Sequence, residues 1–199
     1  MSAIRKEGVR RILALLFTVV GVLAVTSVQS QASSSDTNAK FAAQAEAAGL
    51  TATQRASLQA RVDRYLDKVG GTQVAANRID FGPKDFLLLA LPGEKSARDL
   101  SKPLTVRSSN APNFCYYKYF CAYSKTNFYG DAWNRSSCGY PLGIPFTGPG
   151  SWANNQTKGT VAYMYGDSTD DLIYKTPGAY SADKYGNWTP VGWVMPCTY

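Results

Sequence analysis

The pattern of apolar and polar positions changes several times along the chain, and its first part predicts an export signal. Residues 12–25 form an uncharged, mostly apolar run that follows the basic residues Arg5, Lys6, Arg10 and Arg11. The run is shorter than the roughly 20 residues that a membrane-spanning helix needs, and a short apolar run after a basic start is typical of a secretory signal peptide. We therefore expect residues 1–32 to be removed after Ala32. A retained membrane anchor is the alternative.

The next segment begins with polar residues and continues with a helical periodicity. Residues 33–49 begin with a small, polar stretch, and we expect them to form a disordered leader. Over residues 50–69 apolar side chains recur at three- and four-residue spacing, which predicts an amphipathic helix whose stripe packs against the residues that follow. Thr51 or Thr53 can cap its start, and Gly70 with Gly71 can end it. The stripe consists of Leu58, Val62, Tyr65, Leu66 and Val69.

Two short apolar runs after the helix predict a β-hairpin. Residues 73–80 and 86–91 flank a Gly-Pro turn at residues 81–85. A helix with one hairpin is too small to be comfortably stable alone. We therefore expect residues 50–93 to dock on the rest of the protein, with the polar residues 94–112 as a linker.

Aromatic residues are concentrated in the C-terminal part of the chain. Of the 25 aromatic residues, 20 lie between Phe114 and Tyr199. Short aromatic or β-branched runs alternate there with glycine, proline and asparagine, which is the pattern of an all-β sandwich or barrel. The fold class we expect is therefore α+β: a helix and hairpin, then an all-β domain over residues 113–199.

Charge and the missing histidine exclude several functions. Without residues 1–32 the Lys+Arg count falls from 21 to 17 and the Asp+Glu count from 14 to 13, a net charge of +4. With no basic cluster after residue 11, nucleic acid is excluded as a partner. The chain has no histidine, so Ser-His-Asp and Cys-His catalysis are excluded. Carboxylate pairs such as Asp131 with Asp183 remain formally open, but we expect a protein that is not an enzyme.

Four cysteines follow the signal and predict two disulfides, because an exported chain meets an oxidising compartment. Five, sixteen and fifty-eight residues separate them in turn, which does not fit the close pairs of a zinc site. Of the three connectivities we favour Cys115 with Cys121 and Cys138 with Cys197. We expect no metal and no cofactor.

One spacing resembles a known fold family. Tyr123, Phe128 and Gly130 stand at positions Tyr-x4-Phe-x-Gly, which resembles the first hairpin of a βγ-crystallin Greek key. The resemblance implies that the two aromatic rings pack together and that Ser151 hydrogen-bonds back to the hairpin. The calcium-binding positions of that family would fall near Phe146 and Thr147, which offer no carboxylate or amide, so no calcium site is expected there. Asp167, Asp170 and Asp171 form an acidic cluster that we interpret as a solvated turn.

The cysteine-led start of this domain, residues 115–124, resembles a more specific group. Together with the export signal it is similar to the secreted actinobacterial peptidase-inhibitor family of the Streptomyces metalloproteinase inhibitor type. The resemblance implies a secreted monomer that inhibits an extracellular peptidase, possessing a βγ-crystallin-like domain. The loop between Cys115 and Cys121 is the candidate inhibitory element, with Tyr116, Tyr117, Lys118 and Tyr119.

A second function remains open from the residues themselves. Exposed aromatic side chains could stack on cell-wall or other polysaccharide, which would make the protein a non-catalytic binding module. The candidates are Trp133, Trp152, Trp188, Trp193 and nearby tyrosines. A row of exposed rings would favour this function, and buried rings would favour the inhibitor or a purely structural role. The sequence assigns no role to the helix and hairpin of residues 50–93.

Overall fold

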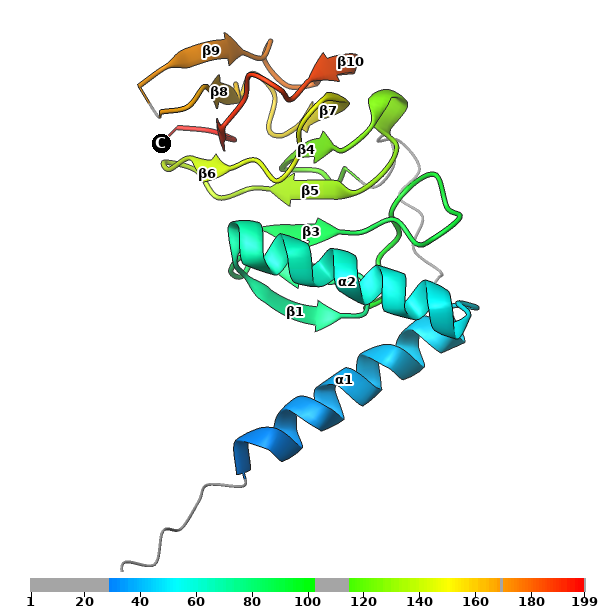
Figure 1. Ribbon diagram of the computed structural model, residues 1–199. Coiled ribbons are helices and arrows are strands. Elements are labelled where there is room, and N and C mark those ends of the chain that lie inside the picture. The colour runs from blue at the N-terminus through cyan, green and yellow to red at the C-terminus, as the bar shows by residue number, and fades with distance from the viewer. Residues whose placement is uncertain (1–28, 103–114, 169, 199) are drawn as a thin grey trace, which may run out of the picture.

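The computed structural model describes residues 29–102, 115–168 and 170–198, and these residues form an α+β fold with mostly antiparallel sheets (Figure 1). The helices are α1 (Gln29–Ala47), α2 (Ala52–Val69) and the 3-10 turn η2 (Thr126–Phe128). The strands are β1 (Thr72–Ala75), β2 (Arg78–Asp80), β3 (Phe86–Leu88), β4 (Tyr119–Tyr123), β5 (Ala132–Arg135), β6 (Leu142–Gly143), β7 (Pro149–Asn155), β8 (Tyr163–Tyr165), β9 (Leu172–Lys175), β10 (Ser181–Asn187) and β11 (Trp193–Met195).

A seven-stranded sheet runs through the parts of the chain that we expected to be separate. Its order is β1-β2-β3-β5-β4-β7-β10, and every neighbouring pair is antiparallel. Leu87 of β3 lies opposite Trp133 of β5. The expected docking of the helix and hairpin is therefore a continuation of the sheet, and no boundary separates a hairpin unit from a β domain within it.

The expected single strand over residues 73–80 is wrong, because the chain turns back after Ala75. β1 pairs with β2 in a tight hairpin, and β2 pairs with β3 in a second one. Asn77 in the first turn is fully buried, and its side-chain amide donates to the carbonyl oxygens of Leu89 and Arg98. The side chain thus satisfies two backbone acceptors that lie outside the turn, one just after β3 and one in the segment of residues 94–102.

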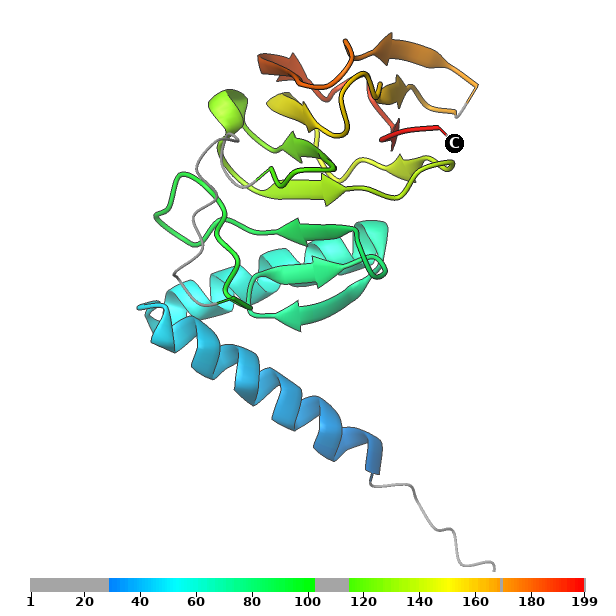
Figure 2. The same ribbon diagram turned by 180° about the vertical axis from the view of Figure 1, so that it is seen from behind.

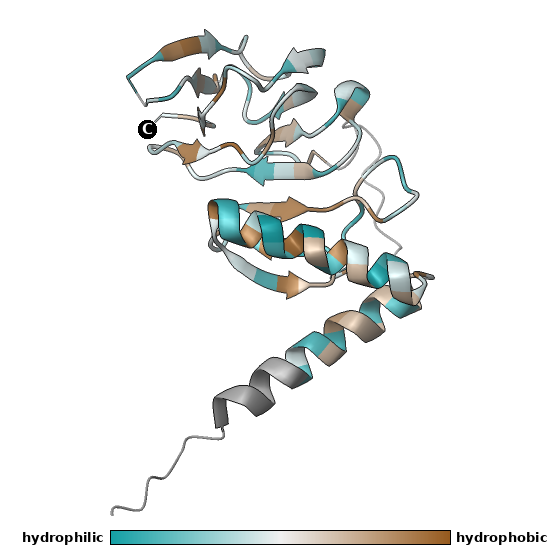
Figure 3. Ribbon diagram, viewed as in Figure 1, coloured by the Kyte–Doolittle hydropathy of each residue, from teal (hydrophilic) through white to brown (hydrophobic). Residues whose placement is uncertain are grey.

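One face of the large sheet carries two covering layers. The helix α2 packs over the β1–β3 end, and a four-stranded sheet of order β6-β11-β8-β9 packs over the other end. Leu58 and Val62 of α2 belong to the same buried cluster as Leu87, Met164 and Val194. Figures 1 and 2 show these layers from opposite sides, and Figure 3 shows that β3 at their junction is apolar along its length.

Helix α2 begins and ends where the sequence predicts. The Thr51 hydroxyl accepts from the Gln54 amide while the Gln54 side chain accepts from the Thr51 amide, a reciprocal capping box. Gly70 follows the last turn with φ +72° and donates its amide to Leu66. Glycine adopts this backbone region without the steric penalty of a side chain.

The expected disordered leader at residues 33–49 is wrong for most of its length, since α1 extends to Ala47. Phe41 and Ala45, one turn apart, are buried in the main core, and the side chain of Gln44 bonds both the Ala76 amide and the Leu100 carbonyl oxygen. The alanine-rich stretch before residue 49 favours helix. Figures 1 and 2 show the start of α1 reaching away from the sheets.

The described part of the expected linker, residues 94–102, is folded against the protein. Ser96 forms a parallel bridge with Gly130, and Ala97 is buried in a second cluster on the other face of the large sheet. Asp99 forms an ion pair with Arg78 at 2.7 Å. Residues 103–112 lie outside the described residues.

The predicted signal lies almost wholly outside the described residues, which include only its last four positions, in α1. Within the described part of the chain, neither helix combines the length and apolar character that crossing a membrane requires. The two disulfides fit an oxidising compartment.

Candidate functional site

The cysteine pairing that we favoured from the sequence is confirmed. Cys115 is bonded to Cys121 and Cys138 to Cys197, with no free thiol left. The first bond closes the loop before β4, and the second ties the C-terminal segment to the residues after β5. Because all four sulfur atoms are consumed, the cysteines provide neither a zinc site nor a nucleophile.

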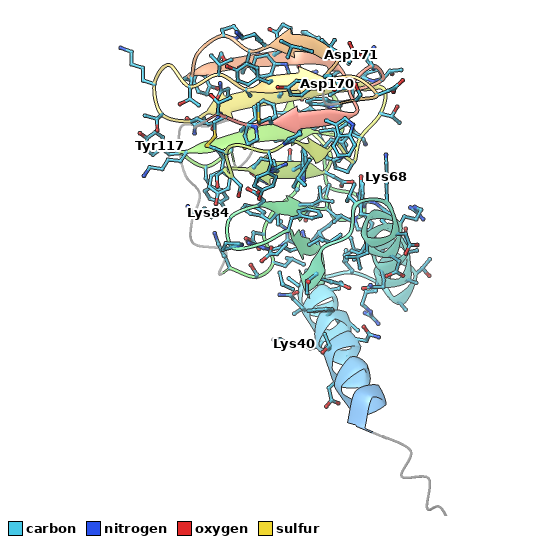
Figure 4. The ribbon with its side chains drawn as sticks, turned by 90° about the vertical axis from the view of Figure 1, so that its left-hand side faces the viewer. Lys40, Lys68, Lys84, Tyr117, Asp170 and Asp171 are labelled. Atoms are coloured by element: carbon cyan, nitrogen blue, oxygen red, sulfur yellow. A yellow bond between two sulfur atoms is a disulfide. The ribbon has the colours of Figure 1, made fainter. Side chains whose placement is uncertain are left out.

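The disulfide-closed loop, residues 115–121, presents two side chains at its tip. Tyr117 is 63% exposed, and Lys118 beside it is also exposed. Lys118 has φ +75°, a left-handed conformation that is uncommon for a residue with a side chain. Its amide donates to the Asn155 carbonyl oxygen at 2.8 Å, which fixes the tip to the end of β7. In Figure 4 the tip projects from one side of the molecule.

The other two tyrosines of the loop form its base. Tyr116 and Tyr119 are half-buried, and their rings lie 6.2 and 5.7 Å from the ring of Phe86. Burial, with the nearby carboxylate of Asp99, raises the pKa of Tyr116. Of the four candidate residues, two therefore support the loop and two are available to a partner.

The residues of the Tyr-x4-Phe-x-Gly spacing lie together in a folded-over hairpin. The rings of Tyr123 and Phe128 meet edge to face, with centroids 5.6 Å apart. The Ser151 hydroxyl accepts from the Phe128 amide at 2.9 Å and donates to the Lys125 carbonyl oxygen at 2.6 Å. Gly130 has φ +81°, and a Cβ there would lie 2.2 Å from the Ser124 hydroxyl oxygen. The hairpin is thus braced against β7.

Most of the tryptophans are structural. Trp133, Trp152 and Trp188 are at most 4% exposed, whereas Trp193 is half-buried. The Trp188 indole donates to the Tyr123 carbonyl oxygen at 2.8 Å, and it fills the space that a side chain at position 150 would need. The first three therefore cannot stack on a surface polysaccharide as we considered from the sequence.

The carboxylates that the sequence left open as a catalytic pair have separate partners. Asp131 is buried and accepts from the Arg61 guanidinium, the Tyr65 hydroxyl at 2.7 Å and the Ala90 amide at 2.8 Å. Burial and the Asp131 carboxylate raise the pKa of Tyr65 far above its ordinary value. Asp183 accepts from the Tyr185 amide on β10. Asp131 is thus a structural link between α2 and the hairpin.

The acidic turn offers no metal cage within the described residues. Asp167, Asp170 and Asp171 are exposed, and no group of three or more cysteine, histidine or carboxylate side chains in the described part is arranged to hold an ion. Figure 4 shows Asp170 and Asp171 at the outer end of the β layers.

Sequence reasoning missed the polar groups that join the N-terminal helix and hairpin to the C-terminal β-rich part. Asp85 and Arg135 form a fully buried ion pair with 3.0 Å between Oδ2 and Nε, although their sequence separation is 50. Asp85 also accepts from the amides of Ser136 and Ser137. No local pattern reports a contact over this separation, because each residue alone resembles an ordinary surface charge.

Comparisons with protein-family models, with curated proteins and with solved structures find no match to this chain. The function therefore has to be argued from the geometry of its loops and cavities.

Proposed function

We propose that this protein is a secreted inhibitor of extracellular peptidases that acts by stoichiometric binding. The observation that carries the proposal is the disulfide-closed loop, whose exposed tip, Tyr117 and Lys118, is restrained by the disulfide and by a hydrogen bond to β7. The peptidase class that the sequence resemblance favours is a metalloprotease.

The tip has the properties of an inhibitory element. Binding a flexible segment costs conformational entropy, and a loop that is already ordered avoids much of this cost. The Cys115–Cys121 bond and the Lys118 hydrogen bond to Asn155 both restrict the tip. Tyrosine is a frequent anchor at protein interfaces. The same restraints oppose the rearrangement that would follow cleavage, so the loop can occupy a cleft without being released as product.

The scaffold behind the loop supports the same family. We infer a βγ-crystallin-like Greek-key domain from the Tyr123–Phe128 ring contact, the left-handed Gly130 and the return hydrogen bonds of Ser151. Export to an oxidising compartment fits the two disulfides. The polysaccharide alternative is weaker, because three of its four tryptophan candidates are buried.

Titration against proteases tests the proposal. The chain without residues 1–32, folded with both disulfides, is added to a thermolysin-like metalloprotease and to a subtilisin-like serine protease, and residual activity and cleavage of the added protein are both scored. We expect stoichiometric loss of activity of one enzyme while the protein stays intact.

Two tip variants and one control make the test specific to the loop. Tyr117→Ala removes the exposed ring, and Lys118→Gly removes a side chain where glycine keeps the left-handed backbone. We expect each to raise the inhibition constant, by roughly 30-fold if it removes a hot spot of about 2 kcal/mol. Tyr185→Ala, at a 73% exposed position on β10, should have no effect. Full protease activity at large molar excess would reject inhibition of these two classes.

A further inference from the structure

A cavity of about 600 Å³ lies at the seam where α2 meets the four-stranded sheet. Lys68 and Val69 at the end of α2 line one side, and Tyr140 and Leu142 line the other. Trp133 of the large sheet also belongs to the lining. Cavities of this size at the junction of structural layers are the usual places for small ligands.

Four aromatic rings from separate parts of the chain line this seam cavity. Phe81 follows β2, Trp133 lies on β5, Tyr140 precedes β6 and Trp193 lies on β11. The guanidinium carbon of Arg135 lies 5.0 Å from the ring centre of Trp133 and 5.8 Å from that of Tyr140. This contact with both rings restrains their orientation.

Hydrogen-bond donors and acceptors also line the cavity. Lys68 donates to the Pro145 carbonyl oxygen at 2.9 Å, and Asp80 accepts from Arg78 at 2.6 Å, so both charged side chains are held in place. Thr72 adds a hydroxyl. The indole nitrogen of Trp133 is buried and has no acceptor among the described residues. This nitrogen is enclosed by protein atoms and is not accessible to a ligand, so the polar groups that the lining offers are Lys68, Thr72 and Asp80.

We infer that the seam cavity binds a pyranose unit of an extracellular glycan. A pyranose ring has an apolar face of C–H groups that stacks on aromatic rings, and a rim of hydroxyl groups that both donate and accept. Tyr140 and Trp193 supply rings for the face, Asp80 is an acceptor, and Lys68 and Thr72 are donors. The charged side chains of the lining are one of each sign, which suits a neutral ligand.

This site gives the N-terminal helix and hairpin a role. Lys68, Thr72, Asp80 and Phe81 come from that half, while Trp133 and the remaining rings come from the other. The inhibitory loop is separate: Cys121 packs on the opposite face of the large sheet from Trp133. In Figure 4, Tyr117 and Lys68 lie on opposite sides of the view.

Calorimetric titration with soluble sugars tests the inference. The disulfide-bonded chain without residues 1–32 is titrated with cellobiose, maltose and N,N′-diacetylchitobiose, and tryptophan fluorescence is recorded in parallel. N-acetyltyrosine amide serves as the probe for a peptide side chain. We expect at least one of the sugars to bind at millimolar concentration or below and to change the fluorescence, with the tyrosine probe weaker.

Variants of the lining locate the binding. Tyr140→Ala and Trp193→Ala each remove a stacking surface and should weaken sugar binding about tenfold or more. Gly143→Leu adds bulk at the rim, where a Cβ would meet no atom nearer than 3.9 Å, and should block binding without removing a ring. Tyr185→Ala on β10 should bind as the parent does. Thermal unfolding of each variant shows that it is folded.

The inference fails if none of the three sugars binds, if binding persists in all three lining variants, or if N-acetyltyrosine amide binds in preference. The last result would assign the cavity to a peptide side chain. Protease inhibition by the lining variants should equal that of the parent, so the two proposals fail independently.

Discussion

Replacing Asp85 isolates a positive charge inside the protein. Arg135 is 0% exposed and its side chain forms its only ion pair in the described structure with Asp85. Both terminal nitrogens of its guanidinium have no hydrogen-bond partner among the described residues. Burial lowers the pKa of Arg135, and the Asp85 carboxylate opposes that shift. Without the carboxylate the cation loses its counter-ion, and the nearby rings of Trp133 and Tyr140 offset only part of its lost hydration.

We expect Asp85→Ala to lower the free energy of unfolding strongly. Removing one partner of a buried ion pair typically destabilises by about 3–5 kcal/mol, while the whole stability of a domain is about 5–15 kcal/mol. Asp85→Ala also deprives the Ser136 and Ser137 amides of their acceptor. Asp85→Asn keeps an oxygen for these amides and removes only the charge, so it should fall between the parent and Asp85→Ala.

Urea unfolding followed by tryptophan fluorescence measures these differences, since three tryptophans are buried. Glu94→Ala is the matched control, because Glu94 pairs with Arg98 at the surface. It should cost no more than about 1 kcal/mol. If Asp85→Ala costs no more than Glu94→Ala, the reasoning that the buried pair joins the two halves is wrong.

Three further outcomes are expected. Replacing both Cys138 and Cys197 by serine opens a crosslink with a sequence separation of 59 and should lower stability by roughly 4 kcal/mol, measured by urea unfolding under oxidising conditions. Ser151→Ala removes both hydrogen bonds of the buried Ser151 hydroxyl, to the Phe128 amide and to the Lys125 carbonyl oxygen, and should cost about 1–3 kcal/mol in the same assay. The raised pKa of Tyr65 keeps the proton bound in the folded state, so stability should be full below the ordinary value of 10.0 and fall as the pH rises above it. Tyr65→Phe should flatten that alkaline decline, and an unchanged decline would contradict the assigned environment.

Local signals predicted the elements that depend on neighbouring residues. The cap at Thr51, the stop at Gly70 and the stripe of Leu58 and Val62 all act within a few turns of one helix, so the sequence was sufficient for α2. The same reasoning was wrong for residues 33–49, where the polar start concealed Phe41 and Ala45 on one helical face. Their burial depends on α2 and the sheet, which no local pattern describes.

For the candidate site, too, the sequence was sufficient for some residues and insufficient for others. Tyr117 and Lys118 could be chosen from the sequence because a short disulfide loop exposes its tip. The burial of Trp133 and Trp188 could not be predicted from the sequence, since an aromatic residue in a β-rich segment has the same local pattern whether its ring faces the core or solvent.

The sequence by itself determined the helix α2 and the β-rich character of the C-terminal part, because caps, spacing and turn residues act over short distances. It favoured one of three cysteine pairings without deciding among them. Only the tertiary structure decided that β3 pairs with β5, that Asp85 meets Arg135, and that a cavity opens at the seam. The physical reason is that these contacts join residues about 50 or more positions apart, where the geometry of packing, rather than local preference, selects which side chains meet.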